Sequence, residues 1–140
     1  GTRLAGAPLR VKLGGWMSKM APAKGMAMVT YHRDYSYFAA RFGIRVVDFV
    51  EPKPGIQPSA KHVEELTARL KLGDIRVLIT RPYVEHRSTD ALAARTGVKI
   101  LTLPLEVGGS QEASDYFRLI DFVTDAITRA MSEIPASSGR

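Results

Sequence analysis

Two side chains that follow apolar runs, His32 and Glu106, could bind a metal ion. His32 follows the short apolar run Met26–Val29, and Glu106 lies in a loop after a second apolar run. Neutral imidazole and carboxylate are the ligands that zinc and manganese accept from a protein without thiolates, and this chain has no cysteine. We therefore take His32 and Glu106 as candidate metal ligands. A capping or surface histidine and a solvated carboxylate remain the alternatives at these two positions.

Further polar side chains follow apolar runs in the same way. They are Arg33, Asp34, Arg81, Glu85, His86 and Arg87. The carboxyl ends of parallel strands meet at one edge of a sheet, where ligands bind in open α/β folds. We expect these side chains to gather at that edge. His62 is expected at the surface instead, in the first turn of a helix.

The elements that would bring these residues together alternate along the chain. Short apolar runs typical of buried strands recur four times, at 26–29, 45–50, 75–80 and 98–103. Segments with helical spacing follow them, at 35–42, after the capping residue Ser59, at 89–96 and at 114–131. This alternation predicts an α/β fold, a four-stranded parallel sheet that is doubly wound with helices on both faces.

The amino-terminal part is predicted to differ from the rest. Leu9 to Met20 has helical spacing and should end near Pro22. We divide the chain into an N-terminal helical segment (1–24), one α/β lobe (25–134) and a flexible tail (135–140).

Composition excludes several function classes. The formal net charge is +6, but the basic residues are scattered and do not alternate with stacking aromatics, so no nucleic-acid partner is expected. No apolar run is long enough to cross a membrane, and no signal peptide is visible. Glycine-rich phosphate loops and nucleophile elbows are absent, which makes an enzyme the least favoured class.

Several segments, taken in order, resemble a known family. The stretches Val29-Thr-Tyr-His32, Arg81-Pro-Tyr83 and Leu103-Pro-Leu-Glu-Val-Gly-Gly109 are similar to the carboxy-terminal lobe of metal-specific solute-binding proteins. These are the zinc and manganese receptors of bacterial ABC importers. The likeness runs from about Leu13 to Met131.

The resemblance implies a function and a location. Members of this family hold the metal between two lobes, outside the cytoplasm, in the periplasm or tethered to the cell surface, and deliver it to a membrane permease. By resemblance, His32 is the third ligand and Glu106 the fourth, with Arg81 and Glu85 supporting the ligands or gating the cleft. Residues before Met20 would be the end of the helix that links the lobes.

The sequence departs from the family pattern in two ways, and these departures support a second hypothesis about function. The amino-terminal lobe, which supplies two histidines, is missing, and Arg81 stands where an acidic residue is usual. A lobe without metal binding that acts as a protein-interaction module is therefore the second hypothesis, and self-association through the exposed cleft face is left open.

Overall fold

The sheet has the predicted parallel architecture. In the computed structural model, which describes residues 3–4, 7–8, 15–109, 111 and 114–133, four strands form one parallel sheet in the order β4-β3-β5-β6. The strands are β3 (Ala27–Thr30), β4 (Arg45–Phe49), β5 (Ile75–Thr80) and β6 (Lys99–Thr102). The α/β fold class expected from the alternating pattern is confirmed.

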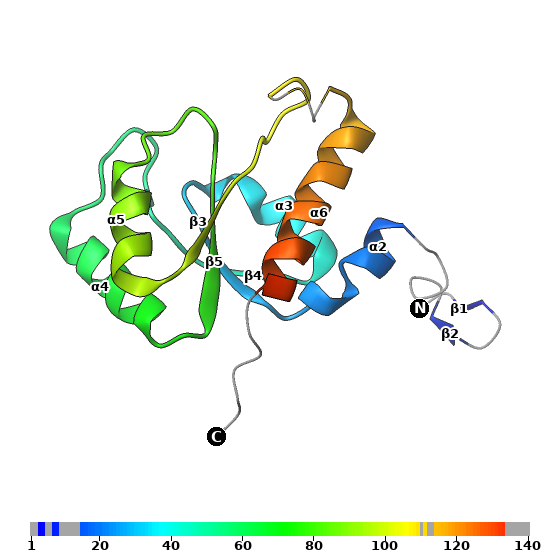
Figure 1. The fold of residues 1–140 in the computed structure, drawn as a ribbon, viewed down its shortest axis with the longest axis horizontal. Coiled ribbons are helices and arrows are strands. Elements are labelled where there is room, and N and C mark those ends of the chain that lie inside the picture. The colour runs from blue at the N-terminus through cyan, green and yellow to red at the C-terminus, as the bar shows by residue number, and fades with distance from the viewer. Residues whose placement is uncertain (1–2, 5–6, 9–14, 110, 112–113, 134–140) are drawn as a thin grey trace.

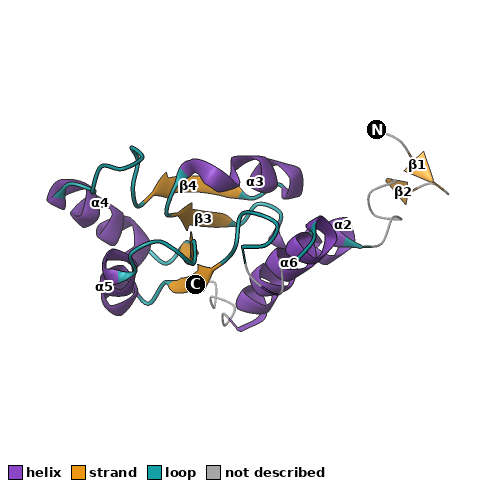
Figure 2. Ribbon diagram, turned by 90° about the horizontal axis from the view of Figure 1, so that it is seen from above, coloured by secondary structure: helices purple, strands orange, loops and turns teal. Residues whose placement is uncertain are grey.

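Helices cover both faces of this sheet (Figures 1 and 2). They are α3 (Ser36–Phe42), α4 (Ala60–Lys71), α5 (Arg87–Thr96) and α6 (Tyr116–Glu133). Figure 2 shows α4 and α5 on one side of the strands and α3 and α6 on the other. The topology is doubly wound, because the β3–β4 crossover runs over one face of the sheet and the β4–β5 and β5–β6 crossovers run over the other.

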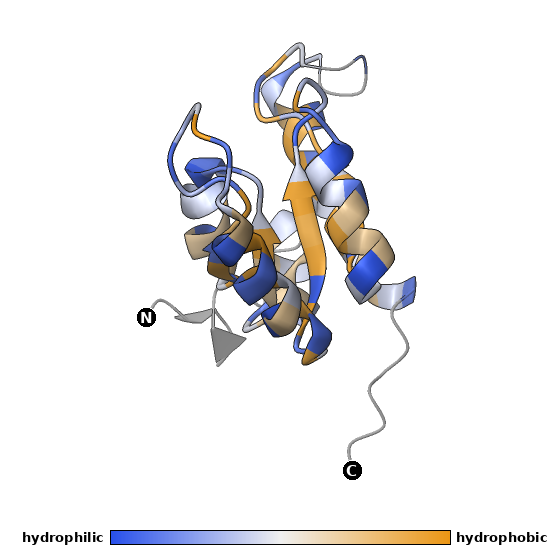
Figure 3. Ribbon diagram, turned by 90° about the vertical axis from the view of Figure 1, so that its left-hand side faces the viewer, coloured by the Kyte–Doolittle hydropathy of each residue, from blue (hydrophilic) through white to orange (hydrophobic). Residues whose placement is uncertain are grey.

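The core therefore consists of two apolar layers, and the strands between them are the most hydrophobic elements in Figure 3. On the α3 and α6 side, Met28, Val77 and Ile79 pack with Ile127. On the α4 and α5 side, the packed residues are Val29, Leu66, Leu78 and Leu92. Tyr116, at the start of α6, lies outside these layers and is 60% exposed.

Local sequence explains where these helices begin and end. The Ser59 hydroxyl accepts a hydrogen bond from the His62 backbone N–H at 3.2 Å, as expected of an N-cap. Gly43 and Gly97 end α3 and α5 in the left-handed conformation, with φ of 70° and 74°. Glycine adopts this conformation without the steric cost that a Cβ would add.

The structure describes only part of the amino-terminal segment. The structure has α2 (Trp16–Lys19) followed by a 3-10 turn, η1 (Ala21–Ala23), and a two-residue antiparallel pair, β1 (Arg3–Leu4) with β2 (Ala7–Pro8). Gly15 is the N-cap of α2, with a φ of 73° that glycine adopts without steric cost. The rest of the predicted 9–20 helix, and the 135–140 tail, lie outside the described residues.

Contacts with α6 hold α2 in place. The Trp16 indole N–H donates to an Asp121 carboxylate oxygen at 2.5 Å, and the Trp16 ring packs on Phe117 with centroids 5.9 Å apart.

No helix in the described part of the chain has the length and apolarity needed to cross a membrane.

Strand order creates the place for a ligand. β3 and β5 are neighbours, yet β3 leads to α3 on one face and β5 leads to α5 on the other. Such a reversal leaves a crevice outside the carboxyl ends of the two strands. His32 comes just after β3, and Arg81 comes just after β5.

Candidate metal centre

His32 sits on a well-defined backbone at the end of β3. Its carbonyl accepts a 2.6 Å hydrogen bond from the Thr30 hydroxyl, and the preceding Tyr31 N–H donates to the carbonyl of Ile79 at 2.7 Å. Its extended φ and ψ of −117° and 176° turn the chain into the 3-10 helix η2 (Arg33–Tyr35). The side chain is only 16% exposed, so the strand end fixes the ring at the inner wall of the crevice.

Both ring nitrogens of His32 face charged groups. Nδ1 lies 3.3 Å from an Arg81 guanidinium nitrogen, Nη2, and 4.0 Å from Asp34 Oδ2, whereas Nε2 lies 3.4 Å from Glu51 Oε1. A neutral imidazole has one N–H and one lone pair. The arginine can only donate and the carboxylate beside Nε2 can only accept a proton, so these contacts favour a proton on Nε2 and a lone pair on Nδ1.

Glu51 is the nearest carboxylate to Nε2 that the structure gives, and sequence reasoning missed it. Its carboxylate accepts from the Gly55 backbone N–H at 2.6 Å. Burial raises the pKa of the Tyr31 phenol, and the charge of Glu51 and its hydrogen bond to that phenol raise this pKa further. Glu51 opens a stretch with prolines at positions 52, 54 and 58, which indicates a loop and gives no sign of a ligand site. The available signal was its place just after β4, which pairs with β3.

The Arg81 guanidinium forms an ion pair with Asp34, but its Nε–H makes no well-aligned hydrogen bond to any described residue. Its Nε lies 2.9 Å from Asp34 Oδ2, but among the described residues the Nε–H has no hydrogen-bond partner. The buried hydroxyl of the preceding Thr80 has none either. A buried hydroxyl left unpaired costs about 1–3 kcal/mol, so Thr80 is the group at the carboxyl end of β5 that the described residues leave unsatisfied.

The other predicted site residues lie in two different hollows. Glu85 lines the same open groove, of about 480 Å³, as His32, Glu51 and Arg87. Glu106 is exposed and lines a smaller hollow, of about 90 Å³, with Arg81 and Tyr83. Arg81 thus contacts His32 and also borders the hollow of Glu106. In the part of the chain that the structure describes, no three His, Asp or Glu side chains are grouped so as to hold a metal ion.

Tyr35 connects the His32 segment to the Glu106 loop. Its buried hydroxyl lies 3.1 Å and 3.2 Å from the carbonyl oxygens of Leu103 and Pro104, to which it donates. Burial raises the pKa of this phenol, the charge of Asp34 raises it further, and Arg81 acts in the opposite direction. The loop that carries Glu106 is therefore fixed to η2 from inside the core.

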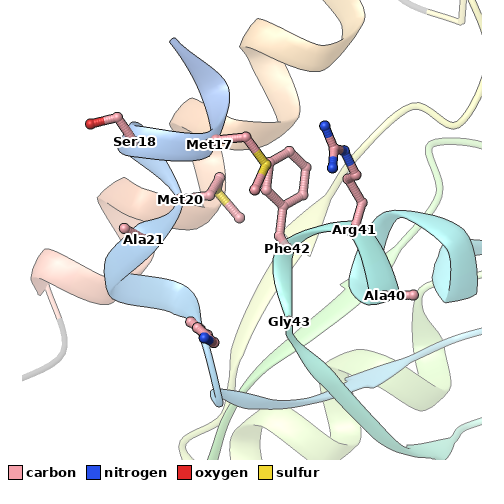
Figure 4. A pocket seen from close by; sticks show the side chains of 9 residues that line it. Met17, Ser18, Met20, Ala21, Ala40, Arg41, Phe42 and Gly43 are labelled. Carbon is pink, nitrogen blue, oxygen red and sulfur yellow. The ribbon is translucent and has the colours of Figure 1, made fainter. Parts of the chain in front are cut away.

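A third hollow lies at the opposite, amino edge of the sheet, between α2, η1 and the end of α3 (Figure 4). It measures about 270 Å³, and Met17, Met20 and Phe42 give it an apolar lining with Lys24 and Arg41 beside them. Histidine and carboxylate side chains are missing from this lining, so the hollow offers none of the ligands expected for zinc.

Comparison with curated proteins gives partial matches. The chain is 27% identical over 109 residues to the zinc-binding protein AdcA of Streptococcus pyogenes serotype M6, covering 75% of this chain and 21% of that protein. It is 26% identical over 93 residues to the high-affinity zinc uptake system protein ZnuA of Bacillus subtilis, covering 66% of this chain and 29% of that protein. The chain thus spans less than a third of these relatives.

Comparison with solved structures also gives matches to part of each protein, and these share the fold. The solute-binding protein FpvC of Pseudomonas aeruginosa in complex with Mn²⁺ superposes with a TM-score of 0.68 at 25% identity, covering 89% of this chain and 47% of that one. A crystal structure of ZnuA superposes with a TM-score of 0.65 at 20% identity, covering 81% and 40%. Residues 13–130 match the family described as zinc-uptake complex component A, periplasmic, and the chain belongs to that family.

Proposed function

We propose that this chain is the carboxy-terminal lobe of a solute-binding protein that carries zinc, alternatively manganese, to the membrane permease of an ABC importer. The lobe would work with an amino-terminal lobe, in the periplasm or anchored at the outer surface of the cell, as a carrier and not an enzyme. In this proposal residues 1–24 include the end of the helix that links the lobes.

The position of His32 carries this proposal. A partly buried imidazole stands where β3 ends, in the crevice between two strands that lead to opposite faces of the sheet. Asp34 and Glu51 put carboxylate oxygens within 4.0 Å of its two nitrogens. An imidazole with carboxylates around it is a typical zinc environment, and partners of the second ring nitrogen orient such a ligand.

Each side chain has a distinct part in the proposed site. His32 binds the ion through the lone pair of one ring nitrogen. Glu51, on the Nε2 side, accepts from the ring and keeps the lone pair on Nδ1. Glu106 supplies a carboxylate from the loop after β6, and Glu85 adds negative charge to the groove that leads to His32.

Zinc titration of the 140-residue chain tests the proposal. The chain has three histidines, so long-range ¹H–¹⁵N spectra of the imidazoles can be assigned by substituting each one. Zinc is expected to shift the His32 resonances first, and His32→Ala should weaken binding at least about tenfold, as loss of one of a few ligands does. His86→Ala is the matched control. Equal zinc affinity in the two variants would reject His32 as a ligand.

The same titration examines the second carboxylate. Glu106→Gln should weaken zinc binding by about tenfold, because an amide oxygen carries no charge to attract the ion. An unchanged affinity would remove Glu106 from the site and leave the role of His32 untouched. Repeating the titrations with Mn²⁺ would rank the two metals.

The second candidate is a lobe that contacts a protein partner without binding metal. The Arg81 guanidinium beside His32, and the lack of a three-ligand group among the described residues, are the observations that favour it. Calorimetry separates the two candidates. One-to-one zinc binding at micromolar affinity or tighter, lost in His32→Ala, supports the carrier, whereas no binding with zinc or manganese supports the interaction module.

A further inference from the structure

The Arg81 guanidinium contacts the ring nitrogen of His32 whose lone pair a metal ion would use. Its Nη2 lies 3.3 Å from Nδ1, and Glu51 beside Nε2 favours the tautomer in which Nδ1 holds the ring's lone pair. If the ring proton were on Nδ1 instead, Arg81 would have no acceptor there, because a guanidinium only donates. The contact with Arg81 therefore uses the one lone pair of the neutral ring.

We propose that Arg81 competes with the metal ion for His32, so that metal binding and the Arg81–His32 contact exclude each other. This inference rests on the proposed function. Binding at Nδ1 displaces the guanidinium directly. Binding at Nε2 moves the ring proton to Nδ1 and ends the hydrogen bond from Arg81. Competition holds for either ring nitrogen.

The positive charge of Arg81 also opposes metal binding at His32. With Arg81 in place, the side chains of Asp34, Glu51 and Arg81 around the ring carry one net negative charge. Without the guanidinium they carry two. A unit positive charge about 4 Å from a divalent ion weakens its binding by roughly thirtyfold at the dielectric constant of water, before screening by salt.

Arg81 also has somewhere to move. Its Nε forms an ion pair with Asp34 Oδ2 at 2.9 Å, but the Nε–H is poorly aligned for a hydrogen bond. The side chain borders the hollow that contains Glu106 and is about one third exposed, so it has room to turn away from His32. In this arrangement the guanidinium remains with Asp34 when the ion arrives.

The test compares Arg81→Met with Arg87→Met in the 140-residue chain. Arg87 is a cation in the same groove as His32 for which the structure gives no contact with the ring, so it controls for net charge. Calorimetry with ZnCl₂ should show at least about fivefold tighter binding for Arg81→Met and little change for Arg87→Met. Arg81→Lys retains a donor and a charge and should stay close to the unsubstituted chain.

A measurement without metal separates competition from a structural role. In the metal-free chain, the imidazole ¹⁵N spectrum should show His32 mainly with its proton on Nε2, and Arg81→Met alone should change this tautomer population. Far-UV circular dichroism establishes that each variant is folded, and Arg81→Leu, which also removes the donor and the charge, replaces Arg81→Met if that variant does not fold.

The outcomes are distinct. Zinc affinity of Arg81→Met equal to that of Arg87→Met, weaker than that of the unsubstituted chain, or still undetectable would overturn the competition. If Arg81→Met binds zinc more tightly but adding His32→Ala to it changes nothing, the proposed ligand is wrong. If His32→Ala abolishes binding while Arg81→Met has no effect, the proposed function stands and the competition falls.

Discussion

Nη2 of Arg81 lies 3.3 Å from Nδ1 of His32, although the two residues are 49 positions apart in the chain. The pairing of β3 with β5 produces this contact, because Val29 pairs with Leu78 and Thr30 with Ile79, each with the same offset of 49. Extending that register by two residues aligns His32 with Arg81. Because strand register sets this contact, substitutions around His32 have specific expected effects.

Glu51→Gln should weaken zinc binding by about tenfold. The carboxylate lies 3.4 Å from Nε2 and helps to set which ring nitrogen carries the proton, and loss of such a partner of a metal ligand costs about 10–100-fold in affinity. Calorimetry with ZnCl₂ measures the change. Glu85→Gln, in the same groove, is the control and should change affinity less than about threefold. An equal effect of both substitutions would show that only overall charge matters.

Asp34→Asn should lower the free energy of unfolding by about 1 kcal/mol. The carboxylate is 16% exposed and lies 2.9 Å from Arg81 Nε, so its loss leaves a partly buried guanidinium without its counter-charge. Since Arg81 is about one third exposed, solvent screening keeps the effect small. Urea unfolding measures it, with Asp125→Asn as control. The exposed Lys19–Asp125 pair should contribute less than about 0.5 kcal/mol, and equal losses would contradict the proposed role of burial.

Tyr35→Phe should cost about 1 kcal/mol at neutral pH and change the response to alkali. Its hydroxyl donates to backbone carbonyls of the Glu106 loop, and a net contribution of about that size is usual for a hydrogen bond. Burial raises the pKa of this phenol above its ordinary value of 10.0, so the folded state binds the proton more tightly than the unfolded state. The resulting stabilisation is complete below pH 10 and is lost as the pH rises above it.

Urea midpoints across the alkaline range measure this dependence. The unsubstituted chain should lose stability above pH 10, and Tyr35→Phe should lose less of it over the same interval. Tyr37→Phe is the control on the neighbouring helix, because that phenol is 92% exposed. Parallel stability curves for the unsubstituted chain and Tyr35→Phe would show that Tyr35 does not cause the alkaline effect.

Ile127→Ala should destabilise the lobe by about 2–5 kcal/mol. Ile127 is fully buried where α6 packs on the sheet, and truncating such a side chain loses apolar burial and leaves a cavity. Urea unfolding gives the value, and Leu72→Ala, at a position 76% exposed, should stay within about 0.5 kcal/mol of the unsubstituted chain. A small effect of Ile127→Ala would mean that α6 is not part of the cooperative core.

Periodicity alone determined much of this lobe. Each strand and helix from Ala27 onward has a local pattern of apolar residues, caps and glycines, so element type and order, the parallel sheet and the place of His32 at a strand end were all predicted correctly. Of the helix predicted over 9–20, the structure describes only the end, where α2 (Trp16–Lys19) lies. Tyr116, at the start of α6, is exposed and packs against Trp16.

Only the tertiary structure decided which side chains surround His32. Chain order does not specify strand order, and β3 turns out to lie between β4 and β5, which brings Glu51 and Arg81 to the two sides of the imidazole. β6 lies beyond β5, and strands in a sheet are about 4.8 Å apart, so Glu106 follows a strand about 10 Å from β3 with Arg81 between. Sequence could identify the candidate ligands, but the lateral order of the strands determined their neighbours.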